Sequence, residues 1–204
     1  MSPRSQADRS DSTRRALIEA GTTLFGRRGF AAVPAEEIVA EAGVTRGALY
    51  HHFDGKHGLF RTVFEELESA ITAEVSEAIA ATPERWPAMI AGLSHFLDAC
   101  QRPDVTRIAL QDAPAVLGWQ TWREIESAHG LGVITDTLQL LADEGLLRCG
   151  SVPVLAQLML SAVIESALLI THAEDQAETR AQAQQGLLML LSGIVDPDAT
   201  PPAD

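Results

Sequence analysis

At 204 residues, the chain can form one compact domain or a small domain fused to a larger one. Apolar residues make up 46% of it and charged residues 21%, which is typical of a soluble globular protein able to build a core. Its net charge of −13 argues against a chain that binds nucleic acid over its whole surface.

The charge is unevenly distributed along the chain. Residues 1–56 hold eight Arg or Lys and seven Asp or Glu, a balance of +1, whereas residues 57–204 hold seven basic and twenty-one acidic residues, a balance of −14. An acidic bulk repels DNA and would turn the N-terminal end of a DNA-binding protein toward it. The solubility of a helical surface explains the acidic part equally well.

Sequence features also predict the compartment. The N-terminus is polar and lacks the apolar core of a secretory signal, and the two cysteines, Cys100 and Cys149, lack the spacing of a metal site. We therefore expect a reduced, cytoplasmic protein, with a redox switch through Cys149 left open. The most apolar region, 152–170, predicts a buried helix and no membrane span, because polar side chains interrupt it. These are Gln157, Ser161, Glu165 and Ser166.

An all-α protein is predicted, because nearly every segment shows the 3.6-residue period of a helix and no convincing alternating strand appears. Residues 1–12 are predicted to be a disordered arm. Three helices follow, over about 13–28, 34–42 and 45–53. Gly29 suits the C-terminal end of the first, Pro34 suits the first turn of the second, and Thr45 can cap the third.

Longer helices are predicted for the rest of the chain. They cover about 56–81, 87–102, 104–117, 119–147, 152–173 and 178–195. Pro114 should kink or stop the helix over 104–117, and the Gly-Leu-Gly run at 130–132 should loosen the one that follows. Residues 196–204 are predicted to be disordered.

The helices over 34–42 and 45–53, joined at Gly43, form a predicted helix-turn-helix. Its second helix is expected to enter the DNA major groove with its N-terminal residues first. Arg46 can pair with a guanine edge or a phosphate, and Lys56 opposes the dipole of the next helix unless an anion lies beside it. The predicted DNA contacts are Thr45, Arg46, Gly47, Ala48, Tyr50, His51, His52 and Lys56.

The stretch AGVTRGALYHHFDGKHGLF, residues 42–60, resembles the signature of the TetR/AcrR family of transcriptional regulators. The resemblance extends back to Thr13 through LFGRRGF at 24–30, and IALQDAPAVLGWQTW at 108–122 is similar to one recurring subtype. It implies a helix-turn-helix DNA-binding domain at 13–60 and a helical effector-binding and dimerisation domain at 61–195. One departure is the start of the second helix, where Val33-Pro34 replaces the family's phosphate-binding Thr or Ser.

Other chemistry is weaker in this sequence. His51 and His52 are adjacent on a helix, so their side chains diverge by roughly 100° and cannot easily share a metal ion. Glu126 and His129 form one E-x-x-H spacing, where a di-iron bundle needs two; we expect an exposed or pocket-edge pair. No catalytic motif occurs, so we predict no enzyme, no metal and no cofactor.

An effector site is predicted among the aromatic residues of the larger part, although aromatic side chains are more often core. Glu165 lies in an apolar helix, where it lines a ligand cavity, pairs across a dimer interface or faces water. The predicted effector-binding residues are Phe64, Trp86, His95, Phe96, Trp119, Trp122, His129 and Glu165.

The predicted function is a homodimeric, ligand-responsive repressor. It would bind a near-palindromic DNA operator, because a two-fold dimer presents two recognition helices about 34 Å apart. A small, largely apolar effector would release it. The dimer interface is assigned to the last two helices, through Leu155, Leu158, Ala162, Ala167, Leu169, Leu187, Leu188 and Leu191. The alternative is a helical small-molecule-binding module whose helix-turn-helix no longer binds DNA.

Overall fold

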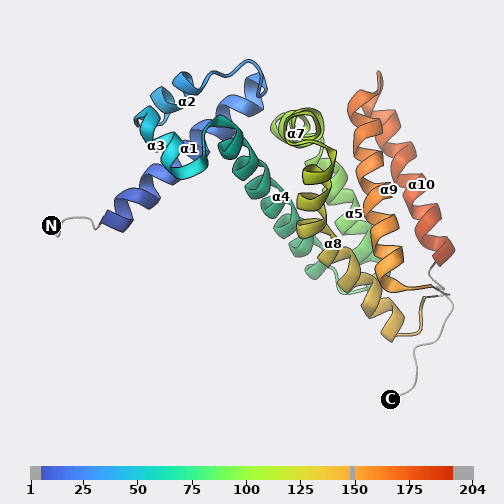
Figure 1. The fold of residues 1–204 in the computed structure, drawn as a ribbon. Coiled ribbons are helices and arrows are strands. Elements are labelled where there is room, and N and C mark those ends of the chain that lie inside the picture. Colours follow the sequence, from blue (N-terminus) through green and yellow to red (C-terminus); the bar gives the residue numbers. More distant parts are fainter. Residues whose placement is uncertain (1–5, 148–149, 195–204) are drawn as a thin grey trace. The chain divides into compact units, whose positions relative to one another are not determined.

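The computed structural model describes residues 6–147 and 150–194, and every regular element of substantial length in these ranges is a helix, which confirms the all-α prediction (Figure 1). The elements are α1 (Gln6–Arg28), α2 (Ala35–Glu41), α3 (Arg46–Phe53), α4 (Lys56–Ala80), α5 (Arg85–Ala99), α6 (Pro103–Val105), the π-helical segment η1 (Thr106–Asp112), α7 (Ala113–Leu117), α8 (Trp119–Asp143), α9 (Val152–His172) and α10 (Gln176–Ile194). Cys149 and the C-terminal tail, on which two predictions fall, lie outside the described residues.

The helices group into two compact units, and each unit is made of two separate stretches of the chain. The first contains residues up to 67 together with 102–122, and the second contains 68–101 and the residues after 122. The predicted domains at 13–60 and 61–195 stay a prediction. The two units are divided differently, because α4 passes from one to the other after residue 67 and the segment 102–122 groups with the N-terminal residues.

The first unit has a core contributed by α1, α2, α3 and the start of α4. Phe25, Ile38 and Leu49 are fully buried, as the helical register predicts. The Phe25 ring meets the Phe60 ring edge-on at a centroid distance of 5.2 Å, and Phe60 meets Phe30 at 5.1 Å. This aromatic cluster fixes α1 against the start of α4.

Local signals set the ends of the short helices. The hydroxyl of Thr45 accepts a hydrogen bond from the Ala48 N–H at 3.3 Å, which confirms its predicted role as N-cap of α3. Gly29 follows α1 with φ of 78°, and Gly43 follows α2 with φ of 64°, a left-handed backbone that glycine adopts without strain. Pro34 is the residue before α2 and provides no side-chain cap.

The predicted disordered arm is wrong for residues 6–12, because α1 begins at Gln6. Once a helix is held by packing farther along, each added turn needs little further stabilisation. Asp8 in the first turn also complements the helix dipole. Residues 8–12 of α1 are mostly exposed, so this part of the extension rests on local helix stability and not on burial.

Pro114 does not stop its helix, so of the predicted kink or stop the stop is wrong, and the kink stays a prediction. The helical path runs from α6 through η1 into α7 and ends at Gly118, whose φ is 81°. In a regular α-helix the proline ring would clash with the carbonyl of Leu110, four residues earlier. The wider π-helical turns of η1 lie just before the proline and accommodate it.

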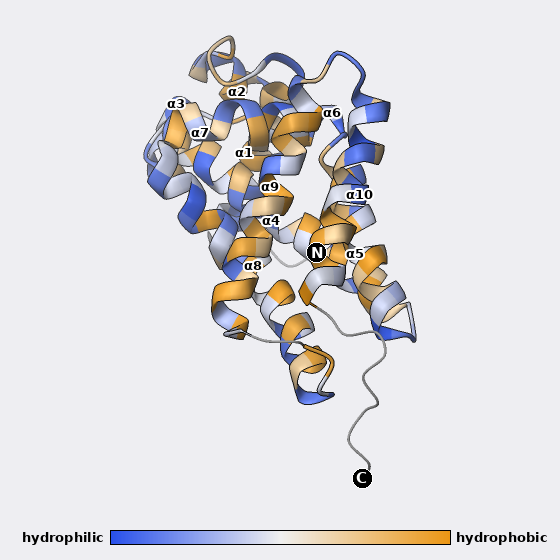
Figure 2. Cartoon of the chain, turned by 90° about the vertical axis from the view of Figure 1, so that its right-hand side faces the viewer, coloured by the Kyte–Doolittle hydropathy of each residue, from blue (hydrophilic) through white to orange (hydrophobic). Residues whose placement is uncertain are grey.

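The second unit is a bundle in which α5, α9 and α10 pack together, with the far part of α8 contributing to the core. Polar and apolar residues alternate along these helices (Figure 2), as amphipathic packing requires. The guanidinium of Arg180 on α10 donates to Asp98 at 2.7 Å and to the Ser94 hydroxyl at 3.0 Å on α5. The core of the second unit consists of Met89, Leu93, Leu97, Leu138, Leu141, Ala156, Ile170, Leu187 and Leu191.

The apolar helix α9 is only partly buried. It is long and apolar enough to cross a membrane by length and composition, and 39% of its most apolar window is buried in the chain. Ala167, Leu187 and Leu191, predicted to lie in a dimer interface, instead belong to the buried core, because α9 and α10 face each other there. Large apolar side chains remain exposed on this pair: Val154, Leu158, Leu169, Met189 and Leu190.

Gly58 lies where the fold leaves no room for a side chain. A methyl group at this position of α4 would lie 1.6 Å from the carbonyl oxygen of Phe53, at the tight junction between α3 and α4. Gly58→Ala should therefore lower the free energy of unfolding by about 1–3 kcal/mol or more. Gly132→Ala on α8, where nothing lies within 4 Å, is the control and should be neutral or stabilising. Equal unfolding curves in urea for both variants would contradict the close contact.

Candidate nucleic-acid interface and effector site

The N-terminal half of α3 presents an exposed polar surface. Thr45, Arg46, Gly47 and Tyr50 are exposed, whereas Leu49 on the opposite side is fully buried. This division follows from the helical period, since the residues that pack against α1 and α2 lie on the other face. Of the other predicted contact residues of this helix, His51 is exposed, and Ala48 and His52 are partly exposed.

Arg46 is held by two neighbours on that face. Its guanidinium donates to the Glu36 carboxylate at 2.7 Å and lies 5.7 Å from the centre of the Tyr50 ring. The Tyr50 hydroxyl and the Glu36 carboxylate both raise the pKa of Arg46. Because all three side chains are exposed, the pair can open to a competing anion or base edge at little cost.

Gly47 leaves the backbone of α3 open. A methyl group at this position would meet only the Thr45 hydroxyl oxygen, at 3.8 Å. Among the described residues, a side chain at this position would therefore meet no close contact.

Lys56, the only lysine in the chain, is occupied by the fold itself. Its ammonium donates to the carbonyl oxygens of Phe30 and Val33, each at 2.8 Å, and lies 3.9 Å from the centre of the Phe30 ring. Partial burial lowers the pKa of Lys56. These two hydrogen bonds use two of the three N–H groups of the ammonium. The sequence did not reveal either contact, and the predicted phosphate contact of Lys56 stays a prediction.

The backbone N–H of Phe30 also has a partner that is far away in the sequence. It donates a hydrogen bond at 2.6 Å to the carboxylate of Asp112, which is the last residue of η1. In addition, Gly26 on α1 packs against Asp104, where a methyl group would come within 3.0 Å of that side chain. The segment 102–122 therefore supports the end of α1 directly. No helical pattern marked Asp112, since its role depends on the loop that it contacts.

At the start of α2, Pro34 stands in the N-cap position, where the TetR/AcrR family usually has a phosphate-binding Thr or Ser. Pro34 has no hydroxyl, and its carbonyl accepts from the N–H groups of Glu37 and Ile38. The N–H groups of Ala35 and Glu36 precede these first helical bonds and are the groups that a phosphate could use.

The predicted effector residues do not form one site. Phe64 and Trp122 are fully buried core residues, and the indole N–H of Trp122 has no hydrogen-bond partner among the residues that the structure describes. Trp86 and Phe96 pack against the core of the second unit. Trp119 is 65% exposed and Glu165 is also exposed, so of the three explanations for Glu165 a ligand cavity within one chain is disfavoured.

The two predicted histidines differ from each other. His95 contacts Glu74 at 3.2 Å, on the neighbouring helix α4. His129 is half-buried on α8, and its E-x-x-H partner Glu126 is only 4% exposed. The expectation of an exposed or pocket-edge pair is therefore wrong for Glu126. Among residues 6–147 and 150–194, no group of three His, Cys, Asp or Glu side chains is placed to hold a metal ion.

The burial of two carboxyl groups in the second unit was not predicted, since Glu68 was not singled out and Glu126 was expected at the surface or at a pocket edge. Glu68 on α4 is 9% exposed and Glu126 on α8 is 4% exposed. The guanidinium of Arg123 donates to Glu126 at 3.2 Å and to the Ser161 hydroxyl at 3.1 Å. A register check could have found both acids, because Glu68 is four residues after the buried Phe64, and Glu126 is four after the buried Trp122.

Burial dominates the electrostatics of this pair. It raises the pKa of Glu68 to about 7. It also raises the pKa of Glu126 to about 8, with a further upward contribution from the neighbouring Glu68 carboxylate and an opposing one from Arg123.

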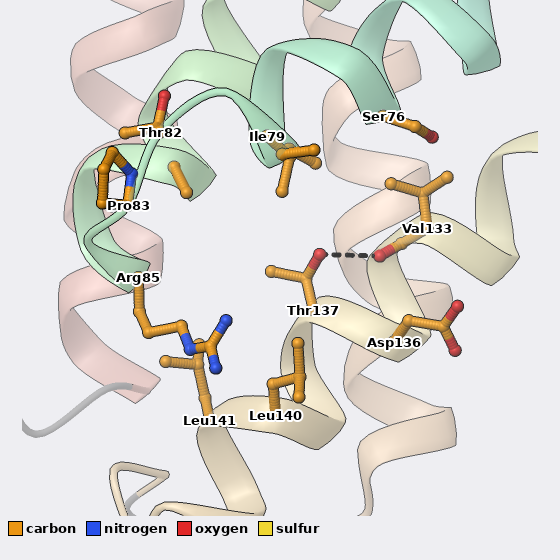
Figure 3. A pocket seen from close by; sticks show the side chains of 12 residues that line it. Ser76, Ile79, Thr82, Pro83, Arg85, Val133, Asp136, Thr137, Leu140 and Leu141 are labelled. Carbon is orange, nitrogen blue, oxygen red and sulfur yellow. Dashed lines mark hydrogen bonds between the residues drawn. The ribbon is translucent and has the colours of Figure 1, made fainter.

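A separate pocket of about 450 Å³ lies farther along the same two helices. Figure 3 shows Ile79, Thr82 and Pro83, from the end of α4 and the turn after it, facing Val133 and Thr137 of α8. The Thr137 hydroxyl donates to the Val133 carbonyl oxygen at 2.8 Å, so its lone pairs remain to accept from a ligand. The lining is Ser76, Ile79, Ala80, Thr82, Pro83, Arg85, Ala88, Val133, Asp136, Thr137, Leu140 and Leu141.

Comparisons with known proteins agree with this architecture. Residues 17–63 match the family described as bacterial regulatory proteins, tetR family, and residues 86–194 match the tetracyclin repressor-like C-terminal domain. The transposon Tn10 TetC protein of Escherichia coli is 25% identical over 177 residues, 87% of this chain and 89% of TetC. The regulator AcrR of Shigella flexneri is 41% identical over 59 residues, 29% of this chain and 27% of AcrR.

Solved structures extend the similarity to the whole fold. A TetR-family transcriptional regulator from Pectobacterium atrosepticum is 27% identical with a TM-score of 0.83, covering 97% of this chain and 100% of that one. The structure of RolR in complex with resorcinol has a TM-score of 0.69 at 15% identity, covering 98% of this chain and 100% of RolR, and shows a likeness of fold alone.

Glu68 makes stability depend on pH. A carboxyl group whose pKa is raised in the folded state destabilises that state increasingly as pH rises from the ordinary glutamate value near 4.5 to about 7. Glu68→Gln removes this penalty, so its free energy of unfolding should exceed that of the wild type at pH 8, by an amount on the order of 3 kcal/mol. At pH 4.5 the gain should largely disappear. Urea unfolding at both pH values measures it.

The matched control is Glu77→Gln, an exposed position on the same helix α4. It removes the same charge and should change the free energy of unfolding little at either pH. A Glu68→Gln variant that is less stable than the wild type at pH 8 would contradict the burial argument.

Proposed function

Because the chain belongs to the TetR family of bacterial transcriptional regulators, we propose that it acts as a homodimeric repressor released by a small-molecule effector. The observation that carries the proposal is the exposed face of α3, which begins at the Thr45 cap and presents Arg46, Gly47 and Tyr50 together. A helix of this kind is the part of a helix-turn-helix that enters the major groove. The cytoplasm is the proposed location.

The residues of this face take different proposed roles. Arg46 pairs with a base edge or a phosphate, and Gly47 with Ala48 allows the helix to approach closely. The remaining polar groups bind the sugar-phosphate backbone, which positions the helix without reading sequence. These are Thr45, Tyr50, His51, His52 and Lys56.

The proposed dimer uses the exposed apolar face of α9 and α10. Val154 and Leu158 are 57% and 61% exposed near the start of α9, and Met189 is 69% exposed on α10. Large apolar side chains gathered on neighbouring helices favour association. A two-fold pair of these helices would cover them and bring two α3 helices to one near-palindromic operator.

The proposed effector binds within the second unit. A pocket of about 450 Å³ has the size and the mainly apolar lining of a small-molecule site. RolR, a protein of similar fold, binds resorcinol in its solved structure, which supports a small effector for this chain too. Helix α4 contributes residues 56–67 to the first unit and 68–80 to the second, so it is the proposed link between effector and DNA.

The binding of effector and the binding of operator are thermodynamically linked in such a regulator. The effector must bind more tightly to the dimer geometry that does not fit the operator. The operator must then weaken effector binding by the same factor.

A second candidate function is a small-molecule-binding module that has lost DNA binding. The absent hydroxyl at Pro34 and the charge of −13 favour it. A gel-shift experiment with the DNA that flanks the protein's own gene separates the two candidates. A shift that an excess of unrelated DNA does not remove supports the regulator, and its absence favours the module.

Arg46 is the most direct test of the DNA interface. Arg46→Ala should weaken operator binding by about 1–3 kcal/mol if the guanidinium reads a base edge. Glu36→Gln, which removes the acidic partner of Arg46, should leave binding unchanged or tighten it. Fluorescence anisotropy with labelled operator measures both. Unchanged affinity and sequence preference in Arg46→Ala would remove this residue from the interface.

Lys56 should show two effects. Lys56→Met removes two hydrogen bonds to the carbonyls of Phe30 and Val33, so thermal unfolding should occur at a lower temperature. If its third N–H also binds a phosphate, the salt dependence of operator affinity should become shallower by about one unit. An unchanged salt slope with reduced thermal stability would assign Lys56 to the fold alone.

A further inference from the structure

The pocket of the second unit is lined by three hydroxyl groups whose protons are already in use. Ser76, Thr82 and Thr137 each donate a hydrogen bond to the backbone carbonyl oxygen four residues earlier in the chain, at 2.8, 3.1 and 2.8 Å. A hydroxyl has one proton to donate and two lone pairs with which to accept. Each of these groups therefore offers a ligand only its lone pairs.

The two charged side chains of the lining do not change this character. Arg85 is exposed, and its Nε donates to the Glu144 carboxylate at 2.9 Å, so a neighbouring acid already balances its charge. Asp136 is exposed, and its carboxylate can only accept hydrogen bonds. An anion would meet a guanidinium that is already paired, and a cation would gain only a carboxylate screened by water. The lining thus favours a neutral hydrogen-bond donor.

Thr137 is the acceptor that a ligand in this pocket can best use. It is partly buried, and it lies on the side of α8 that faces Ile79 of α4 (Figure 3). Among residues 6–147 and 150–194, no N–H or O–H group donates to the Thr137 oxygen. A partly buried acceptor without a donor gains a hydrogen bond when a ligand supplies one.

The apolar wall opposite Thr137 is held in place by close packing. A methyl group added to Gly92 of α5 would lie 2.7 Å from the Ile79 side chain, so α4 and α5 are in tight contact behind this wall. Ala88 and Leu141, which also line the pocket, are buried. The body of a ligand that reaches Thr137 therefore lies among fixed apolar side chains.

We propose that this pocket binds a neutral, mainly apolar molecule whose hydroxyl group donates a hydrogen bond to the Thr137 oxygen. An ether or ester of the same shape would place a second acceptor against Thr137 and leave both without a donor. The inference rests on the proposed function only in making this molecule the effector.

Equilibrium dialysis of the full-length protein near neutral pH tests the ligand class. The probes are three phenols of different shape, 2-naphthol, 4-tert-butylphenol and thymol, each compared with its own methyl ether. The ether keeps the apolar body and the oxygen but has no proton to donate. At least one phenol should bind the wild type more tightly than its ether does.

Thr137→Val connects this preference to the pocket. Valine keeps the shape of threonine and removes the acceptor, so the affinity for the preferred phenol should fall by about 5- to 10-fold, while the affinity for its ether should change little. Thr135→Val is the matched control. The Thr135 hydroxyl makes the same bond, at 2.8 Å to the Leu131 carbonyl oxygen of α8, and Thr135 is outside the pocket lining. This variant should bind both probes as the wild type does.

Three outcomes would overturn the proposal: no phenol preferred over its ether, equal losses for phenol and ether in Thr137→Val, or the same loss in Thr135→Val as in Thr137→Val. Operator binding without ligand is measured on the same samples by gel shift. Phenol binding that depends on Thr137 in a protein without operator affinity would keep the pocket and remove the regulator. Operator binding without any preference for a phenol would do the opposite.

Discussion

The backbone of Phe30 is the point on which the N-terminal unit depends. Its N–H is bound by Asp112, 82 residues away in sequence, and its carbonyl is bound by Lys56, 26 residues away. Losing a partner of a buried backbone group costs about 1–3 kcal/mol. Because α2 starts five residues later, these two bonds and the aromatic cluster around Phe30 set the direction in which the helix-turn-helix leaves α1.

The second unit has the opposite character, since it keeps a source of instability in its interior. Two acids stand where the helical register calls for apolar side chains, and one arginine compensates only part of their charge. Apolar residues of similar volume in such places are often at least as stabilising. Groups that cost stability tend to mark places where a protein does something else.

The sequence allowed some of this to be predicted, and the limits are physical. Helix periodicity, the Thr45 cap and the glycine at position 29 depend on neighbouring residues, so α2, α3 and the end of α1 were predicted correctly. Lys56 and Asp112 depend on carbonyls and N–H groups far away in sequence, which no local pattern reveals. The start of α1 was misjudged because exposed polar residues fit a helix and an arm equally well. The aromatic residues proposed for the effector were mostly core, since burial and ligand contact favour the same side chains.

The discontinuous first unit has a consequence for work with this protein and its relatives. A fragment ending after α4 would lack residues 102–122 and so would lose Asp112 and the fully buried Ile108. A chimera that exchanges the DNA-binding unit of this protein for that of another regulator should therefore exchange the α6–α7 segment together with α1–α4, as two separate stretches of gene. A single crossover after α4 would join α1–α4 of one protein to the α6–α7 segment of another, whose contacts with α1 do not match.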